Sequence, residues 1–226
     1  MRIVVAGGHG KIAMLLHPLL KARGHEVRGL IRNPEHHDEV RHAGAEPVVC
    51  DLEAEDDISG AVSPADAVVF AAGAGPGSGA ARKLSMDRDG AIKLIVAAQR
   101  TGIQRYVMVS AMRPEEPLSK FEQRDDEVFR TYLRAKAEAD EALQRSGLDY
   151  TIIRPGRLTN DPGVGRVHLG AQLPRTEIPR ADVAAVVAQV LEIPATVGCL
   201  FDLTAGEQEI AEAVASAVEA QGKPRD

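Results

Sequence analysis

The sequence predicts an α/β fold in which a doubly wound parallel sheet is covered by helices on both faces. Three observations support this fold class. Short β-branched runs alternate with longer amphipathic segments, a glycine-rich turn follows the first run, and irregular segments follow several later runs. The length of 226 residues suits one sizeable hydrophobic core. We therefore expect a single domain, residues 1–226, with a small C-terminal substrate-side region.

The alternation defines the expected elements in order. Predicted strands occupy residues 2–6, 26–31, 46–50, 66–71, 104–109, 149–154 and 199–203. Predicted helices occupy residues 11–23, 35–43, 53–61, 80–101, 128–146, 180–192 and 207–221, and several are followed by a glycine at the position that commonly ends a helix. Pro34 can open the second helix, with Asn33 as its N-cap.

Three irregular segments follow the carboxyl ends of predicted strands. They are residues 73–79, 112–126 and 155–179. Open α/β sheets bind their ligands at this edge. We expect residues 155–179 to form the substrate-side loop.

The first 32 residues carry the most specific signal. The apolar run 3–6 enters a glycine-rich turn, an apolar helix pattern follows, and a second short strand ends at Arg32. This order is typical of the first half of a Rossmann-type dinucleotide-binding fold. The glycines let the backbone approach a pyrophosphate, and the helix directs free N–H groups at it. The alternative is a tight turn that binds nothing. The expected cofactor contacts are Gly7, His9, Gly10, Lys11 and Ile12.

The end of the second strand indicates which dinucleotide binds. NAD-specific sites usually place a carboxylate there, which would repel a 2′-phosphate. This chain has Arg32 instead, so a guanidinium is available to pair with that phosphate. We therefore expect NADP rather than NAD. The alternative for Arg32 is a solvated surface side chain.

Two further strand ends are candidates for the cofactor site. Asp51 can accept a hydrogen bond from the adenine amino group while Leu52 borders the ring, although Asp51 could equally cap the following helix. Ala71, Ala72 and Gly73 are small enough for a ribose and nicotinamide to lie against the backbone. Close packing explains the small residues equally well.

Candidate catalytic residues follow the fifth strand. Ser110 stands at its carboxyl end, and Tyr132 and Lys136 are four residues apart on the next predicted helix, so they share one face. An ammonium near a tyrosine lowers the pKa of the phenol and suits it to proton transfer. A serine hydroxyl can hold the reacting oxygen. Tyr132 could also be an ordinary helix residue that matches the pattern by coincidence.

These motifs resemble the short-chain dehydrogenase/reductase superfamily. The segments 135–138, 146–156 and 178–184 are similar to its atypical branch, which includes NmrA-like proteins, biliverdin-IXβ reductase and bacterial proteins labelled NAD-dependent epimerase/dehydratase. The resemblance implies that NADP lies across the strand ends. It also implies that Lys136 reaches the nicotinamide ribose and that Pro155 borders the nicotinamide.

Composition excludes several other classes. A net charge of −6 argues against a nucleic-acid-binding surface, and no apolar run approaches the roughly 18–20 residues that span a bilayer. Cys50 and Cys199 form no CxxC pair, so we expect buried, inert thiols in a cytoplasmic protein. The histidines at 36, 37 and 42 lack metal-ligand spacing, so we expect no metal. The expected partner is a small-molecule substrate, and the chain could be a monomer or a homodimer.

The sequence therefore predicts an NADP(H)-dependent oxidoreductase of the short-chain dehydrogenase/reductase superfamily. We expect hydride transfer to or from a small carbonyl, hydroxyl or quinone-like compound, with Tyr132, Lys136 and Ser110 as catalytic residues. One alternative is a non-catalytic NADP(H) redox sensor of the NmrA-like kind. A second is an epimerase or dehydratase that recycles its nicotinamide.

Overall fold

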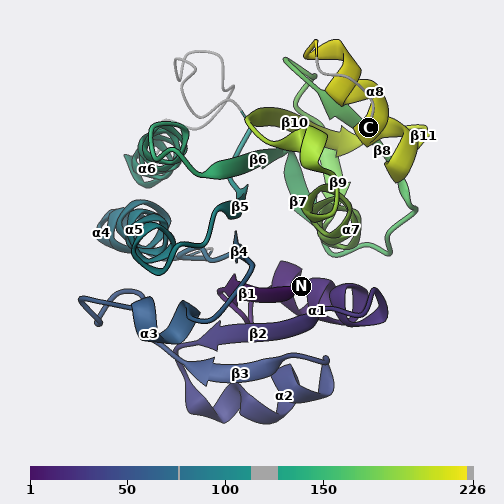
Figure 1. The fold of residues 1–226 in the computed structure, drawn as a ribbon. Helices are drawn as coiled ribbons and strands as arrows, with labels where there is room; N and C mark the ends of the chain where they lie inside the picture. The colour runs from purple at the N-terminus through teal and green to yellow at the C-terminus, as the bar shows by residue number, and fades with distance from the viewer. Residues whose placement is uncertain (76, 113–126, 223–226) are drawn as a thin grey trace.

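The main sheet has nine strands in the order β11-β8-β10-β6-β5-β4-β1-β2-β3 (Figure 1). The structure is a computed structural model that describes residues 1–75, 77–112 and 127–222. Seven neighbouring strands, from β3 to β10, are parallel, and β8 and β11 add an antiparallel edge. The strands of this sheet are β1 (Arg2–Ala6), β2 (Glu26–Ile31), β3 (Glu46–Val49), β4 (Ala67–Phe70), β5 (Arg105–Val109), β6 (Asp149–Pro155), β8 (Arg166–Gly170), β10 (Cys199–Ala205) and β11 (Gln208–Glu209).

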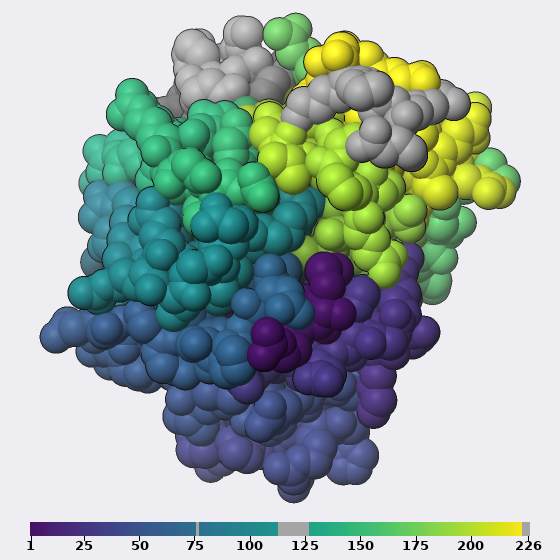
Figure 2. All heavy atoms as spheres, in the orientation of Figure 1, coloured from purple at the N-terminus to yellow at the C-terminus, as the bar shows by residue number. Residues whose placement is uncertain are grey.

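Helices cover both faces of the sheet, which confirms the predicted doubly wound class. Figure 1 shows α5 (Ala91–Thr101) and α6 (Glu127–Gln144) along one face and α1 (Lys11–Ala22) and α7 (Arg180–Leu191) along the other. In Figure 2 the yellow-green C-terminal residues pack against the purple N-terminal ones. The other helices are α2 (His37–His42), α3 (Ser59–Val62), α4 (Ala80–Arg82) and α8 (Ile210–Ala220), with short 3₁₀ turns at Pro34–His36 and Pro194–Thr196.

The central strands are apolar throughout because both of their faces are buried. In β1, Ile3 and Val5 belong to the core beneath α1 and α7, whereas Val4 and Ala6 belong to the core beneath α5 and α6. A strand with helices on both sides needs apolar side chains at successive positions rather than alternate ones. The run at the N-terminus of the sequence thus forms an interior strand of the sheet, between β4 and β2.

The predicted helix at 53–61 is wrong over most of its length, because only α3 is helical there. Asp51 ties the chain into a turn instead. Its carboxylate accepts a hydrogen bond from the Glu53 amide at 2.9 Å, and its own amide donates to the Glu55 carboxylate at 2.7 Å. Such local side-chain bonds compete with helical ones.

The segment 155–179 is more regular than we predicted. It contains β7 (Arg157–Thr159) and β9 (Glu177–Pro179), which form a separate two-stranded sheet, and also β8. β8 pairs with β10, for example His168 with Thr204. These strands are short and their partners are distant in sequence, so local periodicity gives little indication of them. Likewise, the last predicted helix, 207–221, begins only at Ile210, after β11.

The predicted helix at 80–101 is helical throughout but not uniform. Between α4 and α5 lies a π-helical stretch, η2 (Lys83–Gly90). π-helical turns occur frequently at functional sites, because they change the direction in which side chains point. The irregular segment predicted at 112–126 lies outside the described residues from 113 onward. Among the helices of the described part, none is both long and apolar enough to cross a membrane.

Candidate active site

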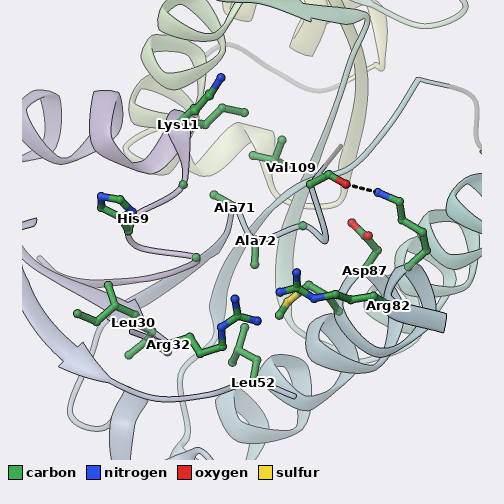
Figure 3. A pocket seen from close by; sticks show the side chains of 18 of the residues that line it. His9, Lys11, Leu30, Arg32, Leu52, Ala71, Ala72, Arg82, Asp87 and Val109 are labelled. Atoms are coloured by element: carbon green, nitrogen blue, oxygen red, sulfur yellow. Dashed lines mark hydrogen bonds between the residues drawn. The ribbon is translucent and has the colours of Figure 1, made fainter. Parts of the chain in front are cut away.

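A cavity of about 560 Å³ runs along the carboxyl ends of the parallel strands. Its volume is in the range of small-molecule and cofactor sites. All the site residues predicted from the sequence line it, with the exception of Pro155. Figure 3 shows that the residues around the cavity come from the glycine turn, the ends of β2 and β5, and the helices opposite. The lining residues from sequence prediction are Gly7, His9, Gly10, Lys11, Ile12, Arg32, Asp51, Leu52, Ala71, Ala72, Gly73, Ser110, Tyr132 and Lys136.

The amino end of α1 forms one wall of the cavity. Gly10 is its N-cap, no side chain caps it, and the first turn contains no acidic residue. Among the described residues, the amides of Lys11, Ile12 and Ala13 have no hydrogen-bond acceptor. Unpaired amides and the positive end of the helix dipole together favour an anion such as a pyrophosphate.

The glycine turn is held in shape by its neighbours. Gly7 has a φ of 79°, and a Cβ there would lie 2.6 Å from the backbone of Ala72. A Cβ on Gly8 would lie 2.7 Å from Gly29 in β2. The turn therefore needs glycine both for its conformation and for close packing on β2 and β4. The sequence indicated the role of Gly7, but the contact between Gly8 and Gly29 required the register of β1 with β2.

Two arginines and one carboxylate meet at the end of β2. The Glu53 Oε2 atom lies 3.3 Å from Arg32 and 3.1 Å from Arg82, and Ser85 donates to Oε1 at 2.6 Å. Figure 3 shows the two guanidinium groups approaching each other from opposite sides. Arg32 was predicted, whereas Arg82 was not, because it comes from α4 on the far side of the cavity. A cavity wall with two guanidinium groups is suited to a phosphate.

Lys136 is buried in the interior beside the cavity, with its side chain 4% exposed. Its ammonium lies 3.3 Å from the Asp87 carboxylate, donates to the Val109 carbonyl at 3.3 Å, and lies over the Phe70 ring. Burial alone would lower the pKa of Lys136, but Asp87 and its other neighbours raise the pKa above its ordinary value. Lys136 is therefore charged at neutral pH.

Tyr132 lies one helical turn before Lys136 and lines the cavity, partly buried. The Lys83 ammonium lies 5.3 Å from the centre of its ring. Burial raises the pKa of the phenol above its ordinary value, Lys136 counteracts part of this rise, and Asp87 adds to it. Tyr132 is thus protonated at neutral pH and available as a proton donor.

Ser110 lines the cavity, and Asp140 lies behind it. The Ser110 hydroxyl is buried and faces the Asp140 carboxylate, to which it is a hydrogen-bond donor. Asp140 also accepts a hydrogen bond from Arg154 through Oδ2 at 2.8 Å. Burial raises the pKa of Asp140 to about 6, although Arg154 and Ser110 counteract part of the rise.

Some of the remaining predictions change in detail. Pro155 does not line the cavity; it lies at the end of β6, where its carbonyl accepts a hydrogen bond from the Met112 amide. His36, for which we expected no role, lines the cavity and stacks on His9 with ring centres 3.6 Å apart. His9 also pairs with Glu39 at 2.9 Å. Cys50 and Cys199 are buried free thiols, as predicted.

The NAD(P)H-binding family model matches residues 7–194, which include the glycine turn, Arg32, Ser110, Tyr132 and Lys136. The chain belongs to this NAD(P)H-binding family. Its membership confirms the resemblance to atypical short-chain dehydrogenases/reductases and the prediction of a nicotinamide dinucleotide site.

Relatives within the NAD(P)H-binding family carry the names of two enzyme classes. YhfK of Bacillus subtilis (strain 168), named an uncharacterized sugar epimerase, is 39% identical over 216 residues, which is 95% of this chain and 99% of YhfK. A solved Bacillus halodurans structure with the provisional name of NAD-dependent epimerase/dehydratase has a TM-score of 0.86 and 41% identity, and covers 95% of this chain and 98% of its own. A farnesyl-dihydroquinoline-oxide ketoreductase of Stigmatella aurantiaca is 30% identical over 167 residues, 69% of this chain and 49% of that enzyme.

Membership in the NAD(P)H-binding family fits the donors that the cavity presents. The free amides of α1 are suited to a pyrophosphate, and the Ser110 hydroxyl lines the same cavity. Glu53, Arg82, Asp87 and His36 also belong to this site and were missed. One signal for Asp87 was present, because it lies four and seven residues before the buried Ala91 and Leu94 and so falls on the buried face of its predicted helix.

Proposed function

We propose that this protein is an NADP(H)-dependent reductase of small carbonyl or quinone-like compounds. The observation that carries the proposal is the meeting, in one cavity, of a phosphate-binding helix end, two guanidinium groups and the Tyr132–Lys136 pair. A bound reduced nicotinamide would supply a hydride. The ketoreductase among the relatives supports this reaction class.

The chain's own residues supply the other requirements of the reaction. Tyr132 holds the proton that neutralises the developing alkoxide, and Ser110 offers a hydroxyl to the same oxygen. Lys136 cannot move far, because Asp87 and Val109 fix its ammonium. The burial of these groups strengthens their electrostatic effect on the reacting oxygen.

The preference for NADPH depends on the arginines in this proposal. We expect Arg32→Ala, and separately Arg82→Ala, to weaken NADPH binding by about 10- to 100-fold, because each removes a charged hydrogen bond to the 2′-phosphate. NADH binding should change little. Titrations followed by nicotinamide fluorescence measure both. Arg41→Ala is the matched control, since Arg41 lies on α2 outside the cavity. Equal affinities for NADPH and NADH in the wild type would defeat the assignment.

Turnover is the direct test of the enzyme function. Incubation with NADPH and a panel of small aldehydes, ketones and quinones should consume NADPH with at least one compound, as measured by loss of nicotinamide absorbance. Tight binding of NADPH with no consumption across the panel would contradict the reductase and support a sensor.

The relatives' names favour a second candidate, an epimerase. An epimerase recycles its nicotinamide, so it would retain bound cofactor and interconvert sugar isomers with no net NADPH consumption. Chromatography of nucleotide sugars incubated with the protein separates the two candidates. A change in sugar stereochemistry would replace the reductase proposal.

A further inference from the structure

Asp87 is a buried carboxylate that the proposed reaction does not itself require. It lies on η2, the π-helical stretch, and is 1% exposed. Its Oδ1 atom contacts the Lys136 ammonium at 3.3 Å, and its Oδ2 atom accepts a hydrogen bond from the Ala74 amide at 3.2 Å. A Cβ on Gly73 would lie 3.2 Å from the same carboxylate. Asp87 therefore joins the helix to the end of β4 and to Lys136 at once.

Burying the Asp87 carboxylate costs free energy unless a close group of opposite charge compensates for the lost hydration. A carboxylate removed from water is stabilised only by a close partner of opposite charge and by good hydrogen bonds. Asp87 has both, and Lys136 in turn has no closer carboxylate among the described residues. The two charges form a nearly neutral pair beside the phenol of Tyr132.

Other charged groups also face Tyr132. Lys136 and Asp140 share its helix, Asp87 and Lys83 come from η2, and Arg175 comes from the segment before β9. Burial lowers the pKa of Lys83. An unpaired Lys136 would be the strongest influence favouring the phenolate, and Asp87 opposes it.

We propose that Asp87 is a positioning residue that fixes Lys136 and offsets its charge, so that Tyr132 remains in the protonated form that the reductive step requires. The inference rests on the proposed function and identifies the protonation state from which that step begins. In reduction, bound NADPH would supply the hydride to the carbonyl carbon, while the phenol O–H bond of Tyr132 breaks and a new O–H bond forms on the substrate oxygen. The phenolate then takes a proton from solvent. Oxidation of the alcohol would need the phenolate first.

The test follows the ionisation of Tyr132 directly and needs no turnover. The chain has three tyrosines and no tryptophan, so tyrosinate absorbance can be resolved by difference. Subtracting the absorbance titration of Tyr132→Phe from that of the wild type isolates the ionisation of Tyr132. Subtracting the titration of Asp87→Asn/Tyr132→Phe from that of Asp87→Asn gives the same ionisation without the Asp87 carboxylate. We expect Asp87→Asn to move this ionisation about one pH unit or more to lower pH, because Lys136 then acts unopposed.

Asp89→Asn is the matched control, because Asp89 is an exposed carboxylate two residues away that pairs with Arg88. It should leave the ionisation of Tyr132 unchanged. If Asp87→Asn is too unstable to titrate, Asp87→Asn/Lys136→Met removes both charges together. The Tyr132 ionisation of that double variant should lie close to the wild-type one, and that of Lys136→Met alone should lie at higher pH.

The outcomes separate this inference from the proposed function. An Asp87→Asn titration that superimposes on the wild type overturns the role of Asp87, even if the protein reduces carbonyls efficiently. An absence of NADPH turnover in the wild type overturns the proposed function instead. In an active enzyme, the pH above which reduction declines should fall in Asp87→Asn together with the ionisation of Tyr132.

Discussion

Replacing Tyr132 with phenylalanine is expected to lower NADPH-dependent turnover by about 10²-fold or more, because the reaction loses its positioned proton donor. Phenylalanine keeps the ring that packs in the cavity wall and removes only the hydroxyl. NADPH affinity should therefore stay within a factor of about two, since Tyr132 serves the reacting oxygen rather than the phosphates. Steady-state rates and fluorescence titrations measure the two effects separately.

Tyr150→Phe is the matched control for this experiment. Tyr150 is partly buried like Tyr132, but it lies on β6 and does not line the cavity. Its replacement should leave turnover unchanged. If Tyr132→Phe retains full activity, the proton comes from another donor, and the catalytic assignment of Tyr132 is wrong.

Asp140 is expected to make the stability of the protein depend on pH between about 4 and 6. Burial raises the pKa of its carboxyl from 3.8 to about 6. The folded protein therefore binds this proton more tightly than the unfolded chain does. The stabilisation from the proton is complete below the unfolded pKa and is lost as the pH rises through the folded pKa.

The corresponding variant is Asp140→Asn, which cannot titrate. The free energy of unfolding of the wild type, minus that of Asp140→Asn, should fall by on the order of 3 kcal/mol between pH 4 and pH 7. Denaturant unfolding at several pH values measures the difference. Glu141→Gln is the control, because Glu141 is the exposed neighbour that pairs with Arg145, and it should parallel the wild type. A difference independent of pH would mean that Asp140 titrates normally.

The fold was predictable because its central strands and long helices have local signals. An apolar run buried on both faces, such as residues 3–6, and the amphipathic pattern of 11–23 each indicate their own element. The predicted secondary structure was wrong where local side-chain hydrogen bonds or pairing between distant segments determine the conformation. Hydrogen bonds of Asp51 hold a turn where a helix was predicted, and β8 forms by pairing with β10 where a loop was predicted.

The candidate site likewise contains some residues that the sequence indicated and others that it did not. The residues of the glycine turn, Arg32 and the Tyr132–Lys136 pair could be found from the sequence because each belongs to a motif with a fixed spacing. Arg82 and Glu53 could not be found by spacing, because their partners come from other segments of the chain. The helical spacing of Asp87 places it on a buried face but does not reveal its partner Lys136. Their roles depend on distances across the cavity.

By itself, the sequence determined the doubly wound sheet and the nicotinamide-dinucleotide-binding family, and it predicted the amino-terminal turn as part of the binding site. These properties follow from local periodicity and from motifs within a few dozen residues. Only the tertiary structure decided which charges meet. Arg32 shares Glu53 with Arg82, and Lys136 is buried against Asp87. Electrostatic interactions depend on distance and burial, and both are fixed only when segments far apart in the chain are packed together.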